Sequence, residues 1–247
     1  KPALMLSEVS NSSKWKKGRL WFLDPEDKYV LRVFNSITTL LHINTDQVKR
    51  DEMRSAKDVL NEKWKGKIST DDPAAAGRGA NTAATFYSHF GEQFVKRLYL
   101  DQKPVISRNR RQLTDWLARG TYPISLSVGD DDAEQVRKDG FHVLDIYGLA
   151  DLPGVLSGGP YVLSLANKAP HPNAAIVFVN WMASREALEI YSRATISATL
   201  RTDVDESFLP PTIIPRSGAK YFDSYDWQWT ATESEKVRLL LKTLLNR

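Results

Sequence analysis

The sequence predicts an α/β fold in which the chain passes twice between two sheet-based lobes. Strand-like segments rich in β-branched residues alternate with segments of helical periodicity, an order typical of α/β folds with mainly parallel pairing and right-handed crossovers. Residues 29–44 have the pattern of one strand, which would span about 50 Å, so it either breaks in the middle or passes from one lobe to the other. Residues 152–166 are punctuated by Gly and Pro and then alternate, which predicts a second passage.

The composition is that of a globular soluble chain. Its 247 residues are 42% hydrophobic and 26% charged, with a net charge of +4, which suits one large domain or two modest lobes. No apolar run reaches the length of about 18 residues that a membrane span needs. The absence of cysteine excludes disulfides, thiol catalysis and cysteine-based zinc sites, and it fits the oxidising periplasm of bacteria.

The first half of the chain predicts a loop-like start, a short edge strand and then the long strand. Within that long strand Asn35, Ser36, Thr38 and Thr39 form a polar middle that a passage between lobes would expose to solvent. Helix-forming residues follow the strand, and a second strand and helix come after them. The predicted segments are loop at 1–28 with a strand at 19–24, strand 29–44, helix 51–63, strand 67–70 and a helix that continues through 93–99.

The stretch 64–87 joins a strand, a loop and the start of a helix. Asp71, Asp72 and Pro73 end the strand, residues 77–79 form a permissive loop, and Asn81 or Thr82 is placed to cap the helix. Unpaired backbone N–H groups at such a helix start favour a small anion or a polar ligand. An ordinary strand-to-helix turn explains the same residues. The GRGANT sequence lacks the spacing of a nucleotide-binding fingerprint.

The second half predicts further alternation of helices and strands and then a long loop. Gly120 follows a helix in the manner of a C-terminal cap, and an acidic run at 130–132 suits the first turn of the next helix. The predicted segments are helix 109–118, strand 121–128, helix 130–138, strand 141–146, the passage strand within 152–166, one helix over 169–193, loop 194–230 and helix 234–245.

Three of these stretches carry a family resemblance. The segments WKGKISTDDP at 64–73, RQLTDWLARGTYPISL at 111–126 and APHPNAAIVFVNWMASREALEIY at 169–191 resemble the periplasmic solute-binding proteins of ABC importers. The resemblance is to the ferric-iron-type branch, extracellular solute-binding protein family 1. It implies a periplasmic-binding-protein-like (type II) fold of two α/β lobes joined by hinge strands, with the solute held in the cleft.

The resemblance also implies a division of the chain. Residues 1–40 would form the remainder of the first lobe and the first hinge strand, and 41–160 the second lobe. Residues 161–205 would return through the hinge to the first lobe, and 206–247 would form a C-terminal loop and helix across the lobes. Family members begin with a further strand–helix region, which this sequence does not contain, so the first lobe is expected to be incomplete.

The function implied by the resemblance is capture of a small polar or charged solute for import. The expected partners are that solute and the membrane permease of an ABC importer, with no nucleic acid, in a monomeric periplasmic protein whose signal peptide is not in this sequence. Neither a cofactor, a metal site, a catalytic residue nor enzyme activity is expected. Ferric-binding members use an adjacent tyrosine pair where this sequence has Val128, Gly129 and Asp130, so the resemblance does not extend to the tyrosyl iron site.

Ten polar residues are candidate ligand contacts because they lie on strand-end loops or passage strands. Turn chemistry and helix capping explain Asp72, Asn81 and Thr82 without a ligand. Arg78 is harder to explain in that way, because a guanidinium beside a helix start suits a carboxylate or phosphonate. The candidates are Ser36, Thr38, Asp72, Arg78, Asn81, Thr82, Tyr122, Ser125, Asp130 and Ser157.

Two other functions remain open at this stage. A carboxylate-dependent hydrolase would use Asp71 and Asp72, although adjacent residues on a strand point to opposite faces. A basic nucleic-acid-binding module would use the run KWKKGR at 14–19 with its flanking residues Trp15 and Trp21. The four histidines are scattered without the spacing of a zinc site.

Overall fold

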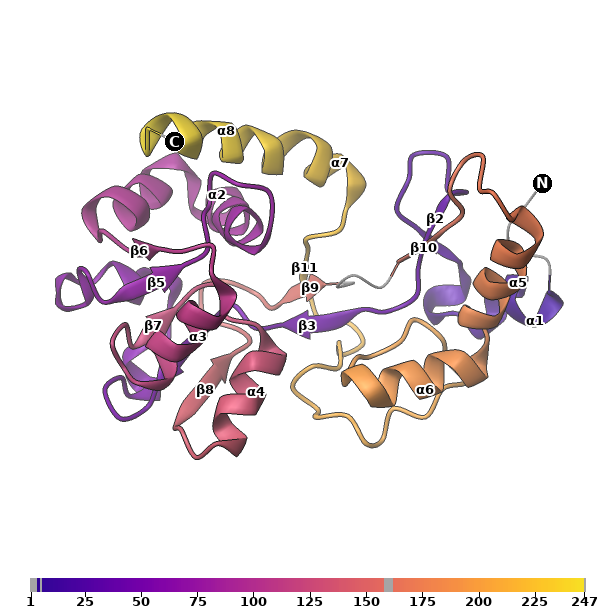
Figure 1. Cartoon of the computed structure of the whole chain (residues 1–247), viewed down its shortest axis with the longest axis horizontal. Coiled ribbons are helices and arrows are strands. Elements are labelled where there is room, and N and C mark those ends of the chain that lie inside the picture. Colours follow the sequence, from indigo (N-terminus) through magenta and orange to yellow (C-terminus); the bar gives the residue numbers. More distant parts are fainter. Residues whose placement is uncertain (1–3, 5, 158–161, 247) are drawn as a thin grey trace. The chain divides into compact units, whose positions relative to one another are not determined.

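The computed structural model describes residues 4, 6–157 and 162–246, and the chain divides into two compact units. Unit 1 comprises Lys1–Ile37, Leu156–Ala219 and Tyr225–Trp227, and unit 2 comprises Thr38–Val155, Lys220–Ser224 and Gln228–Arg247. Figure 1 labels most of the helices and strands of both units.

The chain changes unit inside two short strands that lie within the predicted passages. The first change falls in β3 (Ser36–Thr38) and the second in β9 (Val155–Ser157), and both strands belong to a three-stranded sheet of order β11-β9-β3 with β11 (Phe222–Asp223). The chain also changes unit after residues 219, 224 and 227, which the prediction of two passages did not include. Those changes lie within residues 194–230, which the sequence predicted as a loop, so no strand pattern marks them.

The predicted long strand at 29–44 is three strands separated by breaks. They are β2 (Val30–Arg32), β3 and β4 (Leu41–Asn44). Between β2 and β3, Phe34 forms an isolated bridge to Thr199, and Asn35 N donates to Ala198 O. The strand is interrupted because β2, β3 and β4 each pair with different strands: β2 with β1 and β10, β3 with β9, and β4 with β7 and β8.

Unit 1 is built on a small antiparallel sheet of order β1-β2-β10. Its strands are β1 (Trp21–Phe22), β2 and β10 (Val162–Ser164), with Trp21 opposite Arg32 and Leu163 opposite Leu31. The helices around the sheet and its loops are α1 (Ser7–Ser10), α5 (Pro172–Met182) and α6 (Arg185–Thr195), with 3₁₀ turns at Ser12–Lys14 and Lys16–Gly18. The single helix predicted over 169–193 is two helices, because Ser184 caps α6 through Ala187 N.

A buried arginine organises the core of unit 1. Arg201 is 1% exposed and binds both carboxylate oxygens of Asp203 at 2.8 Å, and its Nη2 lies 2.8 Å from Glu8 Oε1. Its guanidinium also lies over the ring of Trp15, itself 1% exposed, whose indole N–H donates to Val9 O. A buried charge needs such partners to offset its lost hydration.

Unit 2 is built on a five-stranded mixed sheet of order β6-β5-β7-β4-β8. Its strands are β4, β5 (Ile68–Thr70), β6 (Val105–Ile106), β7 (Ile124–Ser125) and β8 (Val143–Ile146). The pairs β5–β6 and β5–β7 are parallel, whereas β4 is antiparallel to both β7 and β8. The prediction of mainly parallel pairing is therefore wrong, because β4 enters the middle of the sheet in the opposite direction.

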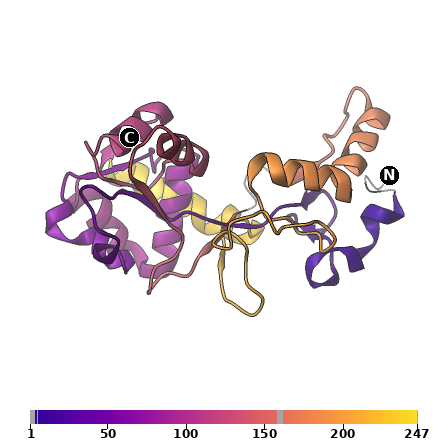
Figure 2. The same ribbon diagram turned by 90° about the horizontal axis from the view of Figure 1, so that it is seen from below.

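Helices cover both faces of the unit 2 sheet (Figures 1 and 2). On one face a large apolar core joins the sheet to α2 (Arg78–Lys96) and α8 (Glu235–Leu244), with Leu41, Ile43 and Phe86 among its buried members. The other face meets α3 (Arg110–Ala118) and α4 (Asp130–Lys138). There Asn44 Nδ2 donates to the carbonyls of Leu117 and Ala118 in the last turn of α3.

The helices of unit 2 follow the predictions in part. The predictions for α3, capped by Asn109, and for α4 are confirmed, and Gly120 follows α3 with φ of +69°. The segment predicted as a helix at 51–63 is three 3₁₀ turns, Arg50–Glu52, Ala56–Leu60 and Glu62–Trp64. The remaining elements are π-helical turns at Arg97–Asp101 and Thr230–Ser234, and the short α7 (Trp227–Trp229).

The start of α2 lies earlier than the sequence indicates. Neither Asn81 nor Thr82 caps the helix; it begins at Arg78 after Gly77, whose φ of +144° favours glycine. Gly79 belongs to the first turn, and a Cβ atom there would lie 2.5 Å from Asp71 O. The missing side chain therefore lets the first turn of α2 pack directly on the backbone that follows β5.

We expect Gly79→Ala to destabilise the protein. Alanine favours helices over glycine by about 1 kcal/mol, but overpacking costs about 1–3 kcal/mol, and a backbone oxygen moves aside less easily than a flexible side chain. Thermal unfolding should show a lower melting temperature. Gly148→Ala is the control, because the nearest atom to its added Cβ is 3.9 Å away. A Gly79→Ala variant as stable as the parent would contradict this packing.

Candidate functional site

Polar residues gather where the strands of unit 2 end. The parallel strands β5 and β7 end at one edge of the sheet, and the antiparallel β4 begins and β8 ends at that same edge. Ligands of open α/β sheets bind beyond such strand ends. We use the term strand-end site for the polar residues at this edge of unit 2: Thr39, Thr70, Arg78, Ser127, Asp130 and Tyr147.

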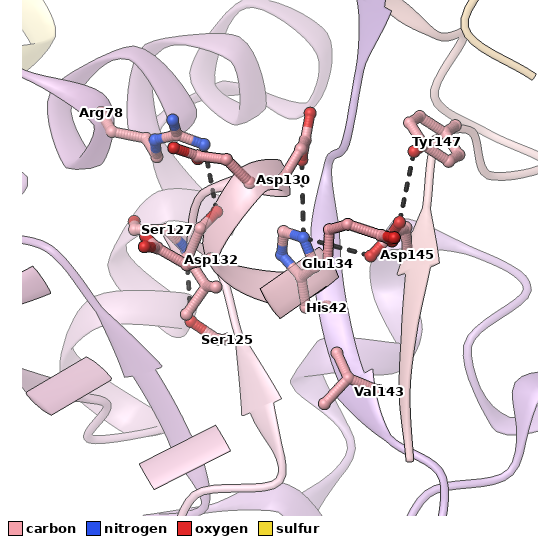
Figure 3. Close-up of polar contacts among 12 residues, drawn as sticks. His42, Arg78, Ser125, Ser127, Asp130, Asp132, Glu134, Val143, Asp145 and Tyr147 are labelled. Atoms are coloured by element: carbon pink, nitrogen blue, oxygen red, sulfur yellow. Dashed lines mark hydrogen bonds and ion pairs between the residues drawn. The ribbon is translucent and has the colours of Figure 1, made fainter. Parts of the chain in front are cut away.

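The most buried part of the strand-end site is a pair of hydroxyl groups, one at the end of β5 and one just after β7. Thr70 Oγ1 and Ser127 Oγ lie 3.1 Å apart, and Ser127 is 6% exposed. Ser127 N in turn is 3.4 Å from the Oγ of Ser125, which is fully buried one layer below (Figure 3). The hydroxyls hold the ends of β5 and β7 together, so their positions are set by the sheet.

Arg78 connects two helix starts. It is the first residue of α2, it is exposed, and its Nη1 donates to Val128 O at 3.0 Å in the turn that leads into α4. Thr82, one turn further along α2, donates to Leu126 O at 3.3 Å. The guanidinium thus stands beside the N-termini of α2 and α4, where the backbone N–H groups also carry partial positive charge.

Asp130 opens α4 and carries the negative charge of the site. Its side chain is 44% exposed, yet its Oδ1 is buried and lies 3.5 Å from His42 Nε2. Burial would raise the pKa of Asp130, but the contact and charge of His42, together with Thr39 and Arg78, lower that pKa below its ordinary value. Asp130 therefore remains a carboxylate over the whole physiological range.

His42 lies under the site between two carboxylates (Figure 3). It is 2% exposed, and the same Nε2 atom that faces Asp130 lies 3.4 Å from Asp145 Oδ1. Asp145 also accepts from Arg137 Nη1 at 2.7 Å and from the Tyr147 hydroxyl at 3.2 Å. Burial, with the charges of Asp145 and Asp130, raises the pKa of Tyr147, so its phenol stays neutral and donates.

The sequence-predicted contacts fall in different places. Arg78 and Asp130 lie in the strand-end site, whereas Ser125 is buried beneath it. Asp72 is 8% exposed and accepts from Ala74 N, as turn chemistry requires, and Tyr122 packs edge-on against Trp116. The exposed Asn81 and the half-buried Thr82 lie in the first turns of α2.

The remaining candidates lie on the crossing strands. Ser36 belongs to unit 1, where its hydroxyl accepts from Ala198 N at 2.8 Å, and Thr38 ends β3 as the first residue of unit 2. Ser157 ends β9 in unit 1.

Sequence reasoning missed His42, Asp145, Arg137 and Tyr147. They come from β4, β8, α4 and the residue after β8, and they meet only because β4 pairs antiparallel with β8, with His42 opposite Asp145. The spacing of residues along the sequence does not indicate such a pairing of distant strands. The one available signal was a histidine in an otherwise apolar, β-rich segment.

The two other functions considered from the sequence find little support. Asp71 Oδ1 accepts from Asp72 N, so these carboxylates serve the turn and do not converge on one point. In the described part of the chain no three His, Cys, Asp or Glu side chains are grouped to hold a metal ion. Trp15 is buried, and Trp21 is stacked by Arg19 at 4.1 Å within unit 1.

Among the described residues, no helix is both long and apolar enough to cross a membrane.

A family model identifies the family of this chain, and solved structures show which fold it shares. The family model described as bacterial extracellular solute-binding protein matches residues 6–189. AfuA from Actinobacillus pleuropneumoniae, solved with fructose 6-phosphate, is similar with a TM-score of 0.68 and 18% identity, over 97% of this chain and 75% of that one. No curated protein matches the sequence.

Two iron-related proteins are similar to a comparable degree. The ferric binding protein from Campylobacter jejuni has a TM-score of 0.67 and 14% identity, over 98% of this chain and 76% of that one. The Trichodesmium protein IdiA (FutA), in complex with iron and citrate, has a TM-score of 0.66 and 17% identity, over 98% of this chain and 76% of that one. At these identities the likeness concerns the fold, and it confirms the periplasmic-binding-protein-like α/β architecture.

We expect Asp130→Asn to reduce the acid sensitivity of the protein. Because the folded-state pKa of Asp130 is lowered, the carboxylate stabilises the fold above its unfolded pKa of about 3.9, and this contribution is lost as the pH falls through the lower folded value. Melting temperatures measured from about pH 5 down to about pH 2 should therefore fall less steeply in the variant. Asp139→Asn, at the other end of α4, is the control, and equal slopes in parent and Asp130→Asn would contradict the assignment.

Proposed function

The chain belongs to the bacterial extracellular solute-binding proteins, and from this premise we propose that it captures a small polar solute and delivers it to the membrane permease of an ABC importer. The observation that carries the proposal is the family match over residues 6–189, most of the chain. The proposal includes a periplasmic location and a monomeric state. It assigns binding to the protein and no catalytic step.

The strand-end site supports a solute that both donates and accepts hydrogen bonds. Arg78 supplies an exposed cation, Asp130 an anion, and Ser127, which lies beside the fully buried Thr70, supplies a hydroxyl group. In the described part of the chain no ion pair within 4.0 Å joins Arg78 to Asp130, so neither charge neutralises the other. Such a mixture suits a sugar, a sugar phosphate or a zwitterion better than a purely apolar or singly charged molecule.

An organic solute fits this chain better than bare ferric iron. One similar structure holds fructose 6-phosphate and another holds iron with citrate, so proteins of this fold accept chemically different guests. At the position of the tyrosine pair this chain has Val128, Gly129 and Asp130, where Val128 supplies its carbonyl to Arg78 and Asp130 opens α4. Ser36, Thr38, Asn81, Thr82 and Ser157 remain proposed further contacts.

A binding screen tests the function. Isothermal calorimetry and thermal-shift measurements against sugars, sugar phosphates, amino acids, amino-phosphonates, polyamines, carboxylates and metal ions should identify at least one saturable solute. Binding to the folded state raises the melting temperature with solute concentration. A well-folded sample that binds no compound of any class would contradict the proposal.

We expect Arg78→Ala to weaken binding of the identified solute by about tenfold to a hundredfold. Hydrogen bonds to charged groups contribute about 1.5–3 kcal/mol, which corresponds to that range. Arg119→Ala is the matched control, because that exposed arginine of α3 is paired with Asp115 at 2.6 Å, in the same unit. If both variants bind as the parent does, Arg78 is not a ligand contact.

A further inference from the structure

The environment of His42 sets a constraint on its protonation. One ring atom, Nε2, faces Asp130 Oδ1 at 3.5 Å and Asp145 Oδ1 at 3.4 Å, in a side chain that is 2% exposed. A bare nitrogen lone pair would repel two carboxylate oxygens, so Nε2 carries a hydrogen. A second proton, on Nδ1, turns the ring into a cation placed between two anions, which strengthens both contacts.

These contacts hold α4 at both of its ends. Asp130 is the first residue of α4, and Arg137, in its last turn, reaches Asp145 Oδ1 at 2.7 Å. His42 on β4 and Arg137 on α4 therefore meet at the same carboxylate oxygen of β8. The ring joins β4 to the helix whose first turn carries the anion of the strand-end site.

We propose that His42 is a positioning residue, whose protonation fixes Asp130 and the first turn of α4 and so links the solute affinity of unit 2 to pH. The inference rests on the proposed function, because it concerns binding at the strand-end site. It predicts tighter binding at the acidic end of the range in which histidine ordinarily changes charge, between about pH 5 and pH 8.

Three titratable groups around the ring, Asp130, Arg137 and Tyr147, keep one charge over that range. Asp130 on α4 stays ionised, since its pKa is lowered, and the phenol of Tyr147, after β8, stays neutral, since its pKa is raised. Arg137 on α4 stays cationic, since against the effect of burial the carboxylates of Asp145 and Glu134 raise its pKa, and it pairs with Asp145 of β8. Arg78 on α2 is the other arginine near Asp130. Thr39, before β4, does not titrate. Protonation of His42 therefore adds a positive charge between the carboxylates of Asp130 and Asp145.

The first measurement requires no solute. Amide hydrogen exchange, corrected for intrinsic rates, is compared at about pH 5.5 and about pH 7.5. Protection of the α4 amides relative to those of α3 should rise at the lower pH in the parent and stay constant in His42→Gln. His142→Gln is the matched control, because His142 also pairs with an aspartate, Asp46, at 2.8 Å, but is exposed.

The second measurement is calorimetric affinity for the tightest-binding compound of the solute panel at the same two pH values. A one-unit change in a group's pKa on binding corresponds to a tenfold change in affinity, so we expect about tenfold tighter binding at the lower pH in the parent and in His142→Gln. His42→Gln should lose this dependence. Asp145→Asn keeps the imidazole but removes one carboxylate, so its affinity should change less between the two pH values. This variant replaces His42→Gln in the test if His42→Gln does not fold.

The outcomes separate the inference from the proposed function. The role of His42 is overturned if protection or affinity depends on pH equally in the parent and in His42→Gln. It is also overturned if the affinity of Asp145→Asn changes with pH as much as that of the parent. A parent affinity that does not change with pH overturns it as well. If no compound of the panel binds at any pH, the proposed function fails, and the exchange measurement alone then decides whether protonation of His42 holds α4.

Discussion

The direction of β4 is the constraint on which the rest of unit 2 depends. This strand lies between β7 and β8 and runs antiparallel to both, so its beginning meets the ends of its neighbours at one edge of the sheet. A parallel β4 would have placed Thr39 at the opposite edge, away from Ser127 and Asp130. Its two faces also differ: Leu41 and Ile43 enter the apolar core, whereas His42 and Asn44 serve the face under α3 and α4.

The residues that precede the two helices near the site cap neither helix with a side chain. Neither Gly77 before α2 nor Gly129 before α4 provides a capping side chain. The start of α2 is fixed by its close approach to the backbone of Asp71 at Gly79, and Arg78 reaches across to Val128 O. Helix N–H groups without a side-chain cap are available to solvent or to a guest, which agrees with a binding role for this edge.

The sequence allowed much of the fold to be predicted, but only part of the site. Helices such as α3 and α4 follow from local signals, the cap at Asn109 and the acidic run from Asp130, which depend on neighbouring residues alone. Arg78 and Asp130 could be singled out because strand-end loops are readable from the same signals. The role of His42 could not, since it depends on which strand lies beside β4 and in which direction, and pairing between distant strands leaves no local trace.

A row of polar side chains crosses the unit 2 sheet, since Ser69 stands opposite Ser125, Ser125 opposite His42, and His42 opposite Asp145. Side chains opposite each other on adjacent strands are close neighbours. A change at one member therefore alters the packing and polarity that the next one meets. Over evolutionary time we expect these four positions to covary, so that related proteins replace them as a set and single exchanges are rare.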